Sequence, residues 1–160
     1  MRERRLMRKT GFSLLEVVIV VAIIAILAAI GIPRMSRGSK GANDSALKGD
    51  LAVLRNSIDL YAAEHGGTYP AGDTVENQLT QYSDAAGATS ASKTTTHIYG
   101  PYLRSVPTLP VGDQKGKTGI ATAAAADTTT AWIYAPTDGS IHANCAGDEV
   151  DDANVPYMNY

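Results

Sequence analysis

The chain is poor in cysteine and in aromatic residues, with one Cys, one Trp and one Phe among its 160 residues. Because Cys145 has no second cysteine to pair with, a disulfide within the chain is excluded. We expect Cys145 to be a small, partly buried side chain rather than a reactive thiol. The three histidines, His65, His97 and His142, follow no ligand spacing, so a zinc site is not expected.

Motifs of catalysis are absent as well. The sequence contains neither a glycine-rich phosphate loop nor a nucleophile elbow, and its Ser, His and Asp residues follow no catalytic pattern. A hydrolase therefore has no support in these residues. We expect that the chain is not an enzyme and that it needs no organic cofactor.

Positive charge is concentrated at one end. The formal net charge is −2, from 14 Lys and Arg against 16 Asp and Glu. Residues 1–11 hold five of the basic residues and one acidic residue, so the remaining chain carries nine against fifteen, a net charge of −6. An acidic chain without a basic cluster argues against binding to nucleic acid.

One long apolar run stands at residues 12–32, with Glu16 as its only charged residue. As a helix, these 21 residues would extend roughly 31 Å, close to the thickness of the hydrocarbon layer. Five cations precede the run and three follow it, namely Arg2, Arg4, Arg5, Arg8 and Lys9, then Arg34, Arg37 and Lys40. This bias predicts a cytoplasmic N-terminus and an extracytoplasmic head.

Two ordinary interpretations compete for this run. A secretory signal peptide would be cut after the small residues Ala29 and Gly31, but its apolar core of about 7–15 residues is shorter than this run. An unprocessed signal anchor explains the length and the charges, with Glu16 reaching toward the surface of the membrane. Neither explains why Gly11-Phe12 precedes the acid at this spacing.

The segment Lys9-Thr10-Gly11-Phe12-Ser13-Leu14-Leu15-Glu16 resembles the processing signal of type IV pilins and type II secretion pseudopilins. The resemblance implies that prepilin peptidase cuts between Gly11 and Phe12, removes the basic leader 1–11 and methylates the nitrogen of Phe12. It also implies that Glu16 pairs with the N-terminal amine of a neighbouring subunit. A buried carboxylate and a buried amine each cost several kcal/mol alone, so pairing can set the register of a filament.

Gly31 and Pro33 end the apolar run. Proline cannot donate a backbone hydrogen bond, and its ring clashes with the carbonyl four residues earlier, so we expect a helix break here. In the family that this end resembles, a Gly-Pro pair at this place is common and the helix melts on assembly. A kink at the lipid boundary is the alternative.

A second helical pattern follows, with apolar residues at spacings of four and three: Leu47, Leu51, Leu54, Ile58 and Tyr61. We predict one helix over residues 13–64, stopped by Gly66-Gly67. The expected divisions are a transmembrane or filament-core helix at 12–33, its amphipathic continuation at 34–65 and an α+β head at 66–160.

In the head we predict a short helix at residues 75–82 and an exposed loop at 84–96. Residues 99–110 are expected to form an extended, proline-rich segment over the core. A β-hairpin is predicted at 132–142, turning at Asp138-Gly139. The acidic tail 144–160 is expected to be irregular. The fold class is therefore α+β, a long N-terminal helix packed on a small antiparallel sheet, which is the lollipop shape that the resemblance implies.

Four acids near the C-terminus form a candidate calcium site, namely Asp148, Glu149, Asp151 and Asp152. Hard cations take six or more oxygen ligands, and acidic loops supply them. The resemblance supports this idea, since major pseudopilins often hold calcium near this end. The spacing does not match an EF-hand, and a solvated acidic tail is the alternative.

The resemblance implies a structural subunit of a type II secretion pseudopilus, because the cysteine pair of many type IV pilins is missing. Its implied partners are further copies of itself, prepilin peptidase, the inner-membrane assembly platform and the secretion ATPase. Its implied location is the bacterial inner membrane, crossed once, with a periplasmic head, and then the assembled filament. The alternatives are a type IV pilin for adhesion, motility or uptake, and a monomeric anchored binding module.

Overall fold

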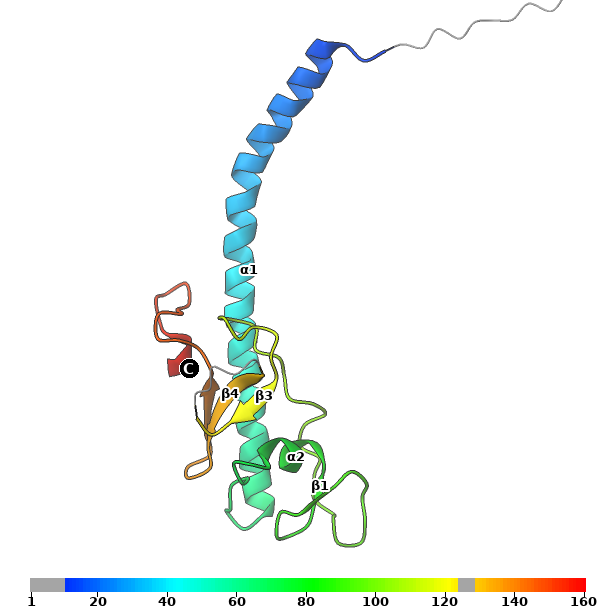
Figure 1. Ribbon diagram of the computed structural model, residues 1–160, viewed down its shortest axis with the longest axis vertical. Helices are drawn as coiled ribbons and strands as arrows, with labels where there is room; N and C mark the ends of the chain where they lie inside the picture. Colours follow the sequence, from blue (N-terminus) through cyan, green and yellow to red (C-terminus); the bar gives the residue numbers. More distant parts are fainter. Residues whose placement is uncertain (1–10, 124–128) are drawn as a thin grey trace, which may run out of the picture. The chain divides into compact units, whose positions relative to one another are not determined.

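The computed structural model describes residues 11–123 and 129–160, and for residues 31–37 it describes the backbone only. The chain divides into two compact units, Met1–Ser39 and Lys40–Tyr160. The second unit contains the C-terminal half of the long helix together with all strands (Figure 1). The α+β class expected from the sequence is confirmed.

Helix α1 spans Leu14–Glu64, within one residue of the predicted start and at the predicted end. In its second half the apolar stripe that begins at Leu47 and ends at Tyr61 is buried against the head. Gly66 and Gly67 follow with φ angles of 65° and 86°, which only glycine adopts readily. The N–H of Gly67 donates to the carbonyl of Ala62 at 2.8 Å, so the helix ends as predicted.

Helix α2 spans Val75–Thr80 and confirms the short helix. Strands β1 (Tyr82–Ser83) and β2 (Thr89–Ser90) follow it as an antiparallel pair. The loop predicted for residues 84–96 therefore contains a short strand, β2. Two-residue strands are too short to produce an alternating pattern, so the sequence did not reveal this pair.

The principal sheet has three strands in the order β3-β4-β5. Strands β4 (Thr130–Ala135) and β5 (Ser140–Ala143) form the predicted antiparallel hairpin, with Gly139 at φ 73° in its turn. Strand β3 (Gly119–Ala121) pairs with β4 in the parallel direction. The sheet is thus mixed rather than wholly antiparallel. The sequence did not reveal this, because residue spacing carries no information on the direction of so short a strand.

The core lies between the second half of α1 and the three-stranded sheet. Trp132 and Tyr134 of β4 are completely buried there. The indole Nε1 of Trp132 donates to the carbonyl of Pro107 at 3.0 Å, and the hydroxyl of Tyr134 donates to that of Pro70 at 2.9 Å. These bonds hold the proline-containing segments on the core, and Leu109 beside them is 1% exposed. The prediction for residues 99–110 is confirmed.

Most of the C-terminal tail is irregular, as predicted, but part of it is buried rather than solvated. It ends in a short 3-10 helix, η1, at Tyr157–Asn159. Tyr157 and Asp151 are buried, with exposed fractions of 5% and 6%. The acidic composition of the tail predicts a solvated segment. Burial of Asp151 and Tyr157 could not be predicted from it, because long-range contacts produce that burial.

Candidate functional site

The residues predicted for processing lie at the start of α1. Gly11, Phe12 and Ser13 precede the helix, and the side chain of Phe12 is 82% exposed. A Cβ built on Gly11 meets no atom within 4 Å. The junction between Gly11 and Phe12 is therefore an accessible peptide bond, and no contact with the described residues requires glycine at residue 11. Leader residues 1–10 lie outside the described part of the chain.

Glu16 lies in the first turn of α1 and is exposed. A carboxylate at this end is favoured by the partial positive charge of the helix N-terminus. Within the described residues the one ion pair joins Lys40 and Asp152, so Glu16 has no cationic partner among them. Its side chain is available to a group on another molecule.

The first unit presents apolar side chains on every side of its helix. The large ones are about half exposed or more: Phe12, Leu14, Leu15, Val17, Val18, Ile19, Val20, Val21, Ile23, Ile24, Ile26, Leu27 and Ile30. A helix that is apolar all round is a buried one, surrounded by lipid or by other protein. Nothing described in this unit covers these side chains, so their surroundings must come from outside the subunit.

Over residues 11–123 and 129–160, no helix is both long enough and apolar enough to cross a membrane. For Gly31 and Ile32, at the end of the predicted span, only the backbone is described. A single pass through the inner membrane stays a prediction.

The helix break predicted at Gly31 and Pro33 is not present. Helix α1 is continuous across both residues. Proline lacks only its own N–H donor and affects one carbonyl, so the turns on either side can keep their hydrogen bonds within a long helix. Whether this segment melts in a filament stays a prediction.

The four acids of the candidate calcium site do not converge. Glu149 accepts hydrogen bonds from the backbone N–H groups of Asp113 and Ala146, and Asp152 pairs with Lys40 at 3.5 Å. Asp148 is exposed. Among the described residues no three His, Cys, Asp or Glu side chains are grouped so that they could hold a metal ion. The calcium prediction therefore receives no support from their placement.

Asp151 instead belongs to a set of contacts that joins the tail to α1. Its Oδ1 accepts from the N–H groups of Ala153 and Val155, each at 2.8 Å, and its Oδ2 accepts from the hydroxyl of Tyr160. The ring of Tyr160 in turn lies 4.7 Å from Nζ of Lys48 on α1. The cation over the aromatic face attaches the tail to the helix.

A second contact of the tail is buried. The hydroxyl of Tyr157 donates to Oδ1 of Asp44 at 2.7 Å, and the N–H of Asp152 donates to Oδ2 at 3.3 Å. Asp44 is 7% exposed. Burial, and then the Asp44 carboxylate, raise the pKa of Tyr157 above its ordinary value. We call the contacts of Asp44, Lys48, Asp151, Tyr157 and Tyr160 the tail clamp. Sequence reasoning missed it, because no spacing links residues more than 100 positions apart.

The tail clamp should open in acid. The hydrogen bond from Tyr160, followed by those from the backbone, lowers the pKa of Asp151. A lowered pKa gives stability that is complete above the unfolded-state value, about 3.9, and is lost as the pH falls through the folded-state value. We therefore expect the near-UV circular dichroism of the tail tyrosines to change as the pH falls below about 4. Asp151→Asn should show a smaller change, and an identical profile for both proteins would contradict the assignment.

Cys145 and His65 are partly buried side chains that contact neighbouring residues. Cys145 is partly buried, and burial together with the Glu149 carboxylate raises the pKa of its thiol to about 12. The thiol is therefore protonated at neutral pH and unreactive, as predicted. His65 stacks on Tyr61 with the ring centroids 3.8 Å apart, and its Nε2 lies 3.0 Å from the carbonyl oxygen of Asp84.

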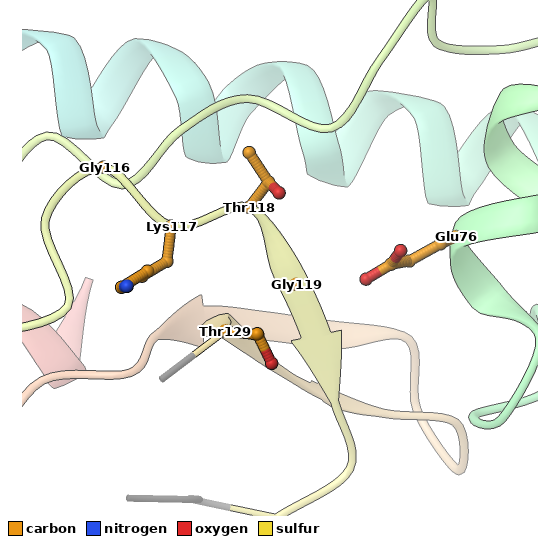
Figure 2. A pocket seen from close by; sticks show the side chains of 6 residues that line it. All are labelled: Glu76, Gly116, Lys117, Thr118, Gly119 and Thr129. Atoms are coloured by element: carbon orange, nitrogen blue, oxygen red, sulfur yellow. The ribbon is translucent and has the colours of Figure 1, made fainter. Parts of the chain in front are cut away.

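A shallow cleft of about 470 Å³ lies beside strand β3 (Figure 2). A smaller cleft of about 330 Å³ shares Glu76 and Thr118 with it and includes Arg104. The lining of the larger cleft is Glu76, Gly116, Lys117, Thr118, Gly119 and Thr129.

The exposed N-terminal segment matches a family model. The model described as "Prokaryotic N-terminal methylation motif" matches residues 6–32. The chain carries the prepilin methylation motif. The matched range includes Gly11, Phe12 and Glu16, and the resemblance to type IV pilins and type II secretion pseudopilins is confirmed.

Two curated relatives extend the similarity beyond the motif. The chain is 29% identical over 106 residues to "Type II secretion system core protein G" of Aeromonas hydrophila, which covers 66% of this chain and 70% of the relative. It is 28% identical over 107 residues to the protein of the same name from Klebsiella pneumoniae, covering 67% and 72%. No solved structure matches the chain significantly. Together with the methylation motif, these relatives support a pseudopilin.

Proposed function

We propose that this chain is a structural subunit of a type II secretion pseudopilus and has no enzymatic activity. In this proposal prepilin peptidase cuts it between Gly11 and Phe12 and methylates Phe12. The mature subunit is anchored once in the inner membrane, with its head in the periplasm. The assembly platform and the secretion ATPase then build it into a helical filament whose growth drives protein export.

The observation that carries the proposal is the apolar surface of α1 beside an accessible cleavage junction. A helix that exposes apolar side chains on every side needs lipid before assembly and neighbouring copies afterwards. Burial stabilises such contacts by about 25 cal/mol per Å², so this surface would be the main cohesive element of a filament core. The chain carries this surface between Leu14 and Ile30.

Cleavage would create a cationic partner for Glu16. A new ammonium group at Phe12 would lie one helical turn from the Glu16 carboxylate, in the same apolar layer. In a filament the amine of one copy can meet the carboxylate of another. Removal of one partner from a buried ion pair costs about 3–5 kcal/mol, so subunits out of register would be strongly disfavoured.

The direct test is the intact mass and the N-terminal sequence of the protein from membranes that contain prepilin peptidase. A chain that starts at Phe12 and is heavier by one methyl group supports the proposal. A chain that still starts at Met1 in those membranes would leave an unprocessed anchor and remove the basis of the filament assignment.

Gly11→Ala should block this processing. A Cβ at residue 11 meets none of the described residues within 4 Å, so the variant should fold and be membrane-associated like the natural protein. We expect at least a tenfold loss of cleaved product on a gel-shift assay, because the motif has no side chain at that position. Thr10→Ala is the matched control beside it. Normal cleavage of Gly11→Ala would count against recognition by the peptidase.

A further inference from the structure

The three-stranded sheet of the head has two outer strands, β3 and β5. An outer strand presents backbone N–H and C=O groups with which a strand of another molecule can pair, and such pairing leads to aggregation. We propose that Glu76 and Arg55 close these two edges against strand pairing with another copy of the chain. The inference concerns the head and is independent of the proposed filament function.

At the β3 edge the closing group is a carboxylate. The N–H of Gly119 donates to the carbonyl of Thr129 at 2.9 Å, on the side of β4. Successive N–H groups of a strand point to opposite sides, so the N–H of Ile120 points to the outer edge. It donates to Oε1 of Glu76 at 2.6 Å, and Figure 2 shows this side chain reaching from α2 toward β3. The carboxylate oxygen takes the place of a carbonyl from an incoming strand.

At the β5 edge the closing group is a guanidinium. The N–H of Asn144 donates to the carbonyl of Ala131 at 2.9 Å, on the side of β4. Ile141 lies three residues before Asn144, so its backbone N–H and C=O groups point to the opposite, outer side. Nη2 of Arg55 donates to the carbonyl of Ile141 at 3.1 Å. The outward carbonyl of Ala143 accepts from the N–H of Cys145 at 3.0 Å and is thus satisfied within its own chain.

Arg55 also holds a covering segment in place. The same Nη2 donates to the backbone carbonyl of Tyr160, next to η1. Arg55 therefore links α1, the outer carbonyl of β5 and the end of the tail. A strand approaching β5 would have to displace both the guanidinium and this segment.

The chemistry of each residue matches the backbone group that it meets. The carboxylate of Glu76 is an acceptor and meets an N–H, whereas the guanidinium of Arg55 is a donor and meets a carbonyl. Neither takes part in an ion pair within the described residues, where Lys40 and Asp152 form the one pair. Both charges are thus directed at the backbone of outer strands, and hydrogen bonds to charged groups are the strong ones.

The test compares Glu76→Ala with Glu76→Gln in the full chain, purified in detergent micelles. Glu76→Ala removes the acceptor, whereas Glu76→Gln keeps an oxygen at its place. In Glu76→Ala we expect the Ile120 amide to exchange with solvent about tenfold faster, as loss of one such bond implies. We also expect β-rich oligomers that bind thioflavin on incubation. The natural protein and Glu76→Gln should form none.

Asp73→Ala is the matched control, since it removes an exposed carboxylate just before α2 without touching the sheet. The double variant Glu16→Ala/Glu76→Ala should form the same oligomers, because the edge route does not use α1. A folded Glu76→Ala with unchanged Ile120 exchange and no oligomers would overturn the proposal. If that variant does not fold, Arg55→Met tests the other edge, and a folded Arg55→Met that stays free of β-rich oligomers would overturn it equally.

Discussion

Glu16→Ala is expected to leave the head folded while filament assembly falls by two orders of magnitude or more. The carboxylate is exposed and forms no ion pair with the residues that the structure describes, so its removal should cost the isolated subunit little. In an assembled core the N-terminal ammonium of a neighbouring copy would then be buried unpaired. That loss is about 3–5 kcal/mol for each contact, a factor of roughly a hundred or more in the association constant.

The measurement is the amount of sheared filament from cells that express the remaining secretion components, read by electron microscopy and immunoblot. Ser13→Ala is the control, because it changes the same exposed turn without altering charge. Cleavage at Gly11 should be normal in both variants, which separates assembly from processing. Filaments of normal number and length from Glu16→Ala would remove the pairing argument.

Trp132→Ala should unfold the head at or near ambient temperature. Trp132 is completely buried against the α1 stripe, and its indole N–H is bonded to the carbonyl of Pro107. Truncation of a buried aromatic side chain costs about 3–5 kcal/mol, a large part of the total stability of about 5–15 kcal/mol for a small domain. The lost hydrogen bond leaves the Pro107 carbonyl without its donor and adds to this cost.

Thermal unfolding followed by far-UV circular dichroism would measure the effect. Leu60→Ala serves as the control, because Leu60 is an equally apolar residue but is 51% exposed on α1, and a change within about 0.5 kcal/mol is expected there. Trp132→Phe should lie between the two, since it keeps the ring packing and loses the bond to Pro107. A Trp132→Ala head as stable as the Leu60→Ala head would contradict the assignment of the core.

Much of the fold could be predicted, because its signals are local. The stripe from Leu47 to Tyr61 requires only the helical period, and Gly66-Gly67 ends the helix through backbone conformation alone. The β4–β5 hairpin follows from two apolar segments separated by a short turn with glycine. The short strand β3 could not be oriented, since three residues have no readable alternation.

The methylation motif is of the same local kind. Gly11, Phe12 and Glu16 lie within six consecutive positions, and with the basic leader before them they indicated the motif that the family model then matched. The structure added that Phe12 at this junction is exposed and that Glu16 forms no ion pair within the described part of the chain. Those properties decide whether a substitution acts on the subunit or on its assembly.

What the order of residues could establish here was the methylation motif, the long helix and its end, because each depends on neighbours within a few turns. The tail clamp and the closing of the sheet edges needed the folded chain. Tyr157 meets Asp44, and Glu76 meets Ile120, across 113 and 44 positions. No periodic pattern spans such separations, since these pairs arise only when packing of the apolar core brings distant segments together.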